Sequence, residues 1–214
     1  MEQYHSFKLP RKSKQNRGWG GRKTAFFIMS YDSHLPVLSY ALDRHGEHVL
    51  EVGSGLASTP LIFKKAKRAI SFENNREWFD KVEGHLRHDE LMGTTKSFIY
   101  TDKIFASVRD FMWHESEPYL SLAFIDSDVW TERCKLISLI EGHADIILLH
   151  DSFDEHLGRC GWQDVNGNTW PIPHFKYRLN LYPVLPPNPS HPPTLILSNT
   201  VDVTKWEVPG LTPG

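Results

Sequence analysis

The sequence has little of what would place the protein in a membrane or in an oxidising compartment. Its 214 residues include only two cysteines, Cys134 and Cys160, and these make neither a disulfide framework nor a metal-binding motif. The longest apolar runs, such as residues 25–29 and 146–149, are far shorter than the roughly 20 residues that span a bilayer. The charged N-terminus also lacks the apolar stretch of a signal peptide. We therefore expect a cytoplasmic protein without a membrane partner.

The histidines show no metal-binding pattern either. There are twelve of them, scattered along the chain without an H-x-x-x-H or H-E-x-x-H motif. The sequence therefore gives no indication of a structural zinc site.

Charge is distributed unevenly. Residues 1–24 contain seven Lys or Arg against a single acid, a net charge of +6, whereas the rest of the chain carries −8. Such an arm can contact a nucleic acid or another polyanion, or it can remain a solvated tail. We divide the chain into a basic arm (1–30), one catalytic domain (31–205) and a C-terminal tail (206–214).

Strand-like and helix-like patterns alternate after residue 30. Helical spacing of apolar residues predicts helices over 34–44, 58–67, 75–86, 104–113 and 130–141, the first capped by Asp32 or Ser33. Short apolar runs predict strands at 48–52, 68–72, 97–100, 120–125 and 144–149, and two final strands at 177–185 and 194–199. This order indicates an α/β fold, a doubly wound and mostly parallel seven-stranded sheet with a C-terminal antiparallel hairpin.

The stretch HVLEVGSGLASTP, residues 48–60, places a glycine-containing turn directly after the first strand. In an open parallel sheet, ligands bind beyond the carboxyl ends of the strands, and Gly53 and Gly55 let a ligand approach the backbone there. Two glycines alone are a weak signal, because tight turns also need them. The next strand ends in Glu73, 18 residues after Gly55, where a carboxylate can accept hydrogen bonds from both ribose hydroxyls. Turn and acid together predict a nucleoside ligand.

The kind of nucleoside follows from two further positions. A nicotinamide-binding turn would carry a third small residue where this chain has Ser58, and Glu51 inside the strand suits a cationic ligand better than a pyrophosphate. With LEVGSG, Glu73 and the final strand pair, residues 49–199 resemble the class I S-adenosylmethionine-dependent methyltransferases.

That resemblance implies S-adenosylmethionine as the cofactor. The turn would line the methionine and ribose of the cofactor, and hydroxyls at the start of the next helix would bind its carboxylate. Glu73 would bind the ribose, and the residues after the second and third strands would contact the adenine. The predicted cofactor-binding residues are Glu51, Gly53, Ser54, Gly55, Ser58, Thr59, Glu73, Asn74 and Asp102. For Asp102, an N-cap of the following helix is an equal alternative.

Two more apolar strands end in polar residues at the same edge, in FIDSD (124–128) and LLHDS (148–152). Methyl transfer to oxygen needs a base beside the acceptor, and an imidazole exchanges protons near neutral pH. We predict Asp126, His150 and Asp151 as catalytic residues, with His150 as the base and an aspartate orienting it. The alternative is a hydrogen-bonded histidine at a strand end without a catalytic role.

These strand ends look most like those of the small O-methyltransferases, including the metal-dependent catechol type. That likeness implies Mg²⁺ at Asp126 and Asp151, with Asp128 as a further oxygen ligand. The chain departs from the catechol pattern, because it has His150-Asp151 in place of Asp-Asn and no lysine after Asp126. Since imidazole suits softer transition metals better, magnesium stays an open expectation.

The sequence thus predicts an S-adenosylmethionine-dependent methyltransferase that acts on a hydroxyl of a small-molecule or sugar-type acceptor. Residues 153–175, with Trp162 and Trp170, would contact the acceptor or merely cover the sheet edge. DNA-base methylation is disfavoured, because IDSDVW contains neither N-P-P-Y nor Pro-Cys. The alternatives are an RNA methyltransferase or a non-catalytic subunit that binds a nucleoside or polyanion. A nicotinamide-dependent oxidoreductase comes third.

Overall fold

The computed structural model of the chain describes residues 33–114, 119–127, 130–152, 174–183 and 193–213. The basic arm, Asp128 and nearly all of the predicted acceptor segment 153–175, with both of its tryptophans, lie outside this part. In the described residues, no helix combines the length and the apolar character needed to cross a membrane.

The described residues alternate between strands and helices, as the sequence predicts. In chain order the elements are α1 (Leu35–His45), β1 (His48–Val52), α2 (Ser58–Lys65), β2 (Arg68–Glu73), α3 (Arg76–His88), β3 (Lys96–Tyr100), α4 (Ile104–His114), β4 (Leu122–Ile125), α5 (Trp130–Ile140), β5 (Ile147–Leu149), β6 (Tyr177–Pro183), β7 (Thr194–Ser198), the 3₁₀ turn η2 (Val203–Lys205) and β8 (Leu211–Pro213).

All strands belong to one sheet, in the order β3-β2-β1-β4-β5-β7-β6-β8. Strands β1 to β5 pair in parallel, whereas β7 pairs antiparallel with both β5 and β6. The mostly parallel sheet with a terminal antiparallel hairpin is therefore confirmed. It has eight strands rather than seven, because the last residues add β8 antiparallel to β6.

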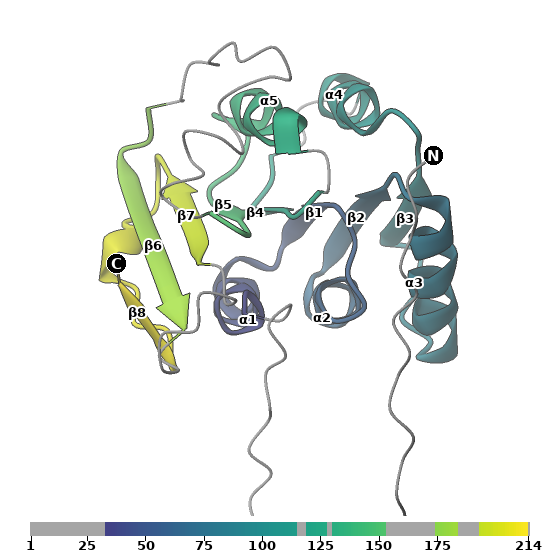
Figure 1. Cartoon of the computed structure of the whole chain (residues 1–214), viewed down its shortest axis with the longest axis horizontal. Helices are drawn as coiled ribbons and strands as arrows, with labels where there is room; N and C mark the ends of the chain where they lie inside the picture. The colour runs from purple at the N-terminus through teal and green to yellow at the C-terminus, as the bar shows by residue number, and fades with distance from the viewer. Residues whose placement is uncertain (1–32, 115–118, 128–129, 153–173, 184–192, 214) are drawn as a thin grey trace, which may run out of the picture.

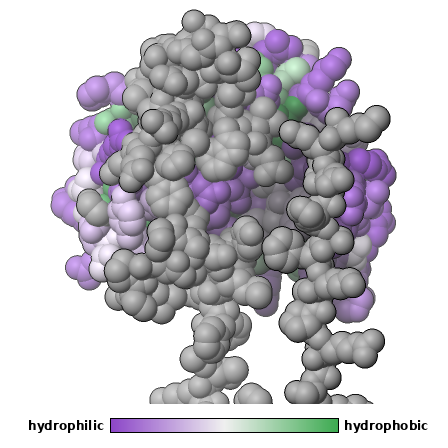
Figure 2. Space-filling view, in the orientation of Figure 1, coloured by the Kyte–Doolittle hydropathy of each residue, from purple (hydrophilic) through white to green (hydrophobic). Residues whose placement is uncertain are grey.

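Helices cover both faces of the sheet (Figure 1). On one face, α1, α2 and α3 pack against Val49, Phe124 and their neighbours. On the other face, α4 and α5 pack against Leu50, Ile125 and their neighbours. The side chains of successive strand residues therefore pack into the apolar cores on opposite faces of the sheet, which explains why these strands are apolar throughout. The surface coloured in Figure 2 is mainly hydrophilic at both sides of the view.

Two ends of the domain differ from the expected boundaries. His34, rather than Asp32 or Ser33, occupies the N-cap position of α1, and it makes no capping hydrogen bond with its side chain. Beyond β7, Trp206 and Val208 are buried in the core beside α1, with the Trp206 ring 5.1 Å from that of Tyr40. Residues 206–213 of the predicted tail therefore contribute to both the core and the sheet.

The turn after β1 lies unusually close to the end of β4. Gly53 has a φ of +87°, and a Cβ built on it would lie 2.5 Å from the carbonyl carbon and oxygen of Asp126. The Asp126 amide also donates a hydrogen bond to the carbonyl of Val52 at 2.8 Å. Only glycine combines this backbone conformation with the absence of a side chain.

We expect Gly53→Ala to lower the free energy of unfolding by about 2–5 kcal/mol, because a left-handed conformation and a backbone clash add together. Gly142→Ala is the matched control, since Gly142 has a φ of +82° but open space around its missing Cβ. That control should lose only the conformational part, about 1–2 kcal/mol. Urea unfolding measures both, and equal losses would show that the contact with Asp126 does not matter.

Candidate active site

Four parallel strands bring the predicted site residues to one edge of the sheet. Glu73 is the last residue of β2, and Gly53, Asp126 and His150 directly follow β1, β4 and β5. The strands β2, β1, β4 and β5 are neighbours in that order. The strand order reverses between β1 and β4, which is where ligands bind in open α/β sheets. The nucleoside-type turn and the acid–base residues are therefore adjacent.

Glu73 connects the ends of β1 and β2. Its Oε2 accepts hydrogen bonds from the amide and hydroxyl of Ser54, at 2.8 and 2.7 Å. Its Oε1 accepts from the amides of Asn74 and Asn75, at 2.9 and 2.7 Å. A carboxylate offers about four acceptor positions, so protein donors already occupy them. A ribose hydroxyl that reaches Glu73 must displace one donor, and the rotatable Ser54 hydroxyl is the one able to leave.

Glu51 lies deeper than the predicted cofactor contact would require. It is fully buried, and its carboxylate accepts hydrogen bonds from Ser58 at 2.8 Å and from Ser71 at 2.6 Å. Burial raises the pKa of Glu51 to about 7, although hydrogen bonds from Ser71, Ser58 and Thr59 oppose the shift. Glu51 therefore links β1, β2 and α2 from inside the protein.

The remaining predicted cofactor residues fall into two groups. Ser58 and Thr59 are buried, and their hydroxyls serve the protein itself, because Ser58 bonds Glu51 and Thr59 accepts from the amide of Gly55 at 3.0 Å. Asn74 is half-buried beside Glu73, and Asp102 is exposed. Helix α4 begins at Ile104, and the Lys103 amide bonds the Thr101 hydroxyl rather than Asp102.

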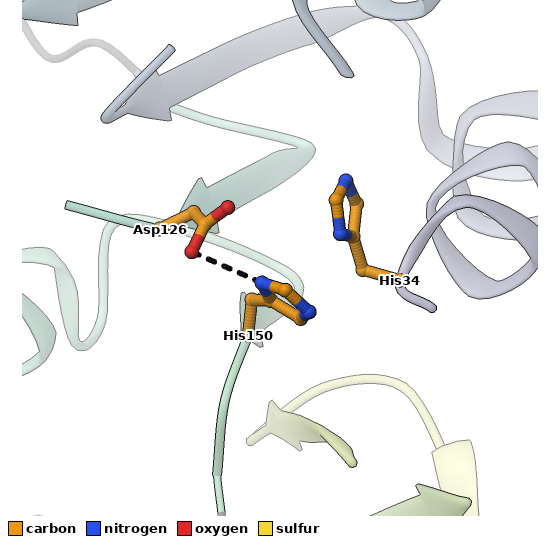
Figure 3. A group of neighbouring side chains, drawn as sticks. All are labelled: His34, Asp126 and His150. Carbon is orange, nitrogen blue, oxygen red and sulfur yellow. Dashed lines mark hydrogen bonds and ion pairs between the residues drawn. The ribbon is translucent and has the colours of Figure 1, made fainter. Parts of the chain in front are cut away.

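The predicted acid–base residues form a cluster at the ends of β4 and β5. Nδ1 of His150 lies 3.0 Å from Oδ1 of Asp126 (Figure 3). Nε2 of His150 lies 3.1 Å from the Ser33 hydroxyl. Asp151 has an unusual φ of +57°, and its Oδ1 lies 3.4 Å from Nε2 of His150. A strained backbone conformation of this kind is typical of functional sites.

A buried arginine that the sequence analysis missed holds this cluster in place. Arg133 on α5 donates to the backbone carbonyls of Ser127 at 2.8 Å and His150 at 2.7 Å, and it lies 3.4 Å from Oδ1 of Asp126. Burial favours a raised pKa for Asp126, but His150, His34 and Arg133 outweigh it and lower that pKa. Arg133 shares a helix face with Leu136 and Ile140, so a charge within an apolar stripe was the available signal.

His34 is the second residue that the sequence analysis did not place in the site. It is 4% exposed, and its ring lies 4.3 Å from that of His150 and 5.0 Å from that of Phe124. Burial and the neighbouring His150 lower the pKa of His34 to about 3, although Asp126 acts in the opposite direction. The imidazole is therefore neutral at physiological pH.

These positions do not make a magnesium site. Asp126 lies among two imidazoles and a guanidinium, and Asp151 contacts His150 rather than sharing an oxygen-rich site with Asp126. Magnesium prefers a shell of oxygen ligands. Among the described residues, the donor set therefore does not fit the expected Mg²⁺.

Comparison with known proteins gives a likeness in structure only. No protein-family model matches the chain, and no curated protein matches it in sequence. The O-methyltransferase TomG of Streptomyces achromogenes, solved with S-adenosylmethionine, is similar at a TM-score of 0.56 and 10% identity, over 80% of this chain and 88% of that one. An rRNA methylase of Streptococcus thermophilus is similar at 0.54 and 14%, over 83% and 100%.

A spermidine synthase of Thermotoga maritima is similar at a TM-score of 0.54 and 12% identity, over 79% of this chain. The present chain spans only 59% of that protein's length. The likenesses agree with the strand order and the terminal hairpin, so the chain has the fold of the class I S-adenosylmethionine-dependent methyltransferases. The similar structures include O-methyltransferases, an rRNA methylase and a spermidine synthase. The fold therefore does not define which molecule accepts the transferred group.

The buried carboxyl of Glu51 should make stability depend on pH. Because its pKa in the folded protein is about 7 against an ordinary 4.5, the folded state retains a proton that the unfolded chain releases. Stability is therefore lost as pH rises from 4.5 to 7, by up to about 3 kcal/mol. We expect Glu51→Gln to remove this loss, so that its stability relative to the wild type improves between pH 5 and 8.

Urea unfolding at a series of pH values tests this expectation. Glu77→Gln, which alters an exposed carboxyl in the first turn of α3, is the control and should follow the wild type. A constant difference between Glu51→Gln and the wild type across this range would show that Glu51 does not carry a buried proton.

Proposed function

We propose that the protein is an S-adenosylmethionine-dependent methyltransferase that methylates a hydroxyl group of a small-molecule or sugar-type acceptor. The observation that carries this proposal is the His150–Asp126 pair, which lies at the end of β5 and β4 directly beside the turn after β1. An acid–base pair next to a nucleoside-type turn is the arrangement that methyl transfer to oxygen requires.

The turn after β1 and the end of β2 suit the cofactor. Ser54 and Gly55 are half-buried and Leu56 is exposed, so the backbone of the turn is accessible. Gly55 could not carry a Cβ without coming within 2.5 Å of the Ser58 hydroxyl. Glu73 is the residue that would hold the ribose, and Asn74 would lie near the adenine. S-adenosylmethionine, when bound, supplies an electrophilic methyl group on a sulfonium sulfur.

The protein's own part is to hold the acceptor and take its proton. With Asp126 accepting a hydrogen bond from Nδ1 of His150, the lone pair of the imidazole lies on Nε2, where it can accept a proton. The Ser33 hydroxyl lies 3.1 Å from Nε2, so an alcohol oxygen already fits at this position. We expect an acceptor hydroxyl to give its proton to Nε2 as its oxygen gains the methyl group.

Binding of the cofactor should depend on Glu73. We expect Glu73→Gln to weaken binding of S-adenosylhomocysteine about 10- to 100-fold, because charge-assisted hydrogen bonds contribute about 1.5–3 kcal/mol. Ser54→Ala removes the hydroxyl that competes for Oε2, so its affinity should stay within about threefold of the wild type or improve. Isothermal titration measures both, with circular dichroism to check the fold. Failure of the wild type to bind would refute the proposed cofactor.

Catalysis should depend on His150 without affecting the cofactor. We expect His150→Gln to lower the rate of methyl transfer about 10²- to 10⁴-fold and to leave affinity for S-adenosylhomocysteine unchanged. The assay follows methyl transfer to a panel of catechols, phenols and sugar alcohols. His143→Gln, at an exposed position in the turn after α5, is the control and should retain full activity. Equal rates in the two variants would exclude His150 as the base.

A further inference from the structure

Three side chains from distant parts of the chain converge beside the proposed base. His34 precedes α1, Asp126 follows β4 and His150 follows β5, and Figure 3 shows them directed toward one another. One ring nitrogen of each histidine and one carboxylate oxygen lie within 4.8 Å of one another. Both histidines are buried, at 4% exposure each.

The His34 imidazole lacks a hydrogen bond to any residue that the structure describes. Neither ring nitrogen has a hydrogen-bond partner among the described residues, although both are buried. Each unsatisfied buried polar group costs about 1–3 kcal/mol, so such groups are rare and require an explanation. An aliphatic side chain could fill the space beside Phe124 without that loss of stability, which points to a requirement for the imidazole itself.

We propose that His34, Asp126 and His150 bind a divalent transition-metal ion of the zinc class. Two imidazole nitrogens and one carboxylate oxygen form a ligand set that zinc uses, with a fourth position left for water or a substrate. The same set disfavours magnesium, which prefers oxygen ligands alone. The site was not evident in the sequence, because the two histidines are 116 residues apart.

The spacing of the ligands needs only a small adjustment. Two ligands about 2.1 Å from a tetrahedral zinc ion lie about 3.4 Å apart, and Oδ1 of Asp126 is 3.0 Å from Nδ1 of His150. His34 must move closer by roughly 1 Å, since the cluster extends to 4.8 Å. In Figure 3 the second carboxylate oxygen of Asp126 points to the side of His34.

The surroundings support these ligands. Within the described part of the chain, His150 and Arg133 both reach Oδ1 of Asp126. A metal ion at Nδ1 would take the place of the proton that His150 donates there, and Arg133 would still hold the carboxylate. Asp151 adds a second carboxylate, with its Oδ1 3.4 Å from Nε2 of His150, the ring nitrogen that faces away from Asp126. Groups that orient metal-bound histidines in this way raise metal affinity.

This site goes beyond the proposed function, because metal binding requires neither the cofactor nor an acceptor. A metal ion at Nδ1 leaves the proton of the neutral imidazole on Nε2, the atom proposed as the base. The two roles of His150 would then be alternatives, and zinc would control whether the base is available.

The experiment is a titration of the full chain, freed of metal with a chelator, with Zn²⁺ in a calorimeter. We expect one Zn²⁺ per chain and no binding of Mg²⁺. Loss of a residue that only orients a metal ligand weakens metal binding about 10- to 100-fold. Because His34 would be a ligand itself, His34→Leu should weaken zinc binding by more than this. The His34→Leu variant should fold, because the buried imidazole that leucine replaces makes no hydrogen bond to the described residues. If this variant does not fold, His34→Asn is the second variant. Co²⁺ absorption on the wild type gives an independent view of nitrogen ligands.

His88→Ala controls for adventitious binding. His88 is exposed at the end of α3 beside Asp89. The substitution therefore removes a surface histidine and leaves the cluster of His34, Asp126 and His150 intact. Zinc affinity that drops in His34→Leu and not in His88→Ala supports the site. Absence of zinc binding to the wild type, or equal affinity in His34→Leu, overturns it. Because no nucleoside is present, this result is separate from the binding of S-adenosylhomocysteine that tests the proposed function.

Discussion

The contact between the turn after β1 and the end of β4 is the constraint on which the rest of the site depends. At Gly53 the two backbones are so close that a single methyl group would not fit. Ser54, beside Gly53, contacts Glu73, and Asp126 contacts His150. The turn that would hold a nucleoside and the cluster that would hold a proton are therefore one rigid unit. Reacting groups gain most when they are positioned before the substrate arrives, and this contact provides that positioning.

The second constraint is electrostatic. Burying the guanidinium of Arg133 is favourable only if its donors find acceptors, and two backbone carbonyls and Asp126 accept three of its hydrogen bonds. The same contacts connect the residues after β4 with the end of β5, so a charge inside α5 sets the distance between Asp126 and His150. Asp126 in turn stays ionised because cationic and imidazole groups surround it. The hydrogen bond and charge of His150 contribute most to lowering the pKa of Asp126, and His34 and Arg133 add to the effect.

Much of the fold, and the edge that carries the site, could be predicted from the sequence, because long apolar strands and amphipathic helices are local patterns. Strand β8 was missed because residues 206–214 contain no such pattern, and its pairing with β6 is a tertiary contact. The sequence places the turn, Glu73, Asp126 and His150 at one edge of the sheet, because each lies at or directly after the end of a strand. His34 and Arg133 were not, since their proximity to His150 depends on how α1 and α5 pack. The hydroxyls of Ser58 and Thr59 were predicted to face a ligand, yet an internal acid and the turn use them.

Glu51 connects these two constraints. Its pKa is raised by burial, and the negative charge of Asp126 contributes to the shift. A cation bound at the cluster would offset the charge of Asp126, and a cation bound at the turn would act on Glu51 directly. Either cation would favour release of the Glu51 proton, so the two parts of the edge are coupled electrostatically through Glu51. Binding free energies are reciprocal. A cationic ligand at the turn that ionises Glu51 would therefore change the affinity of the cluster for a cation.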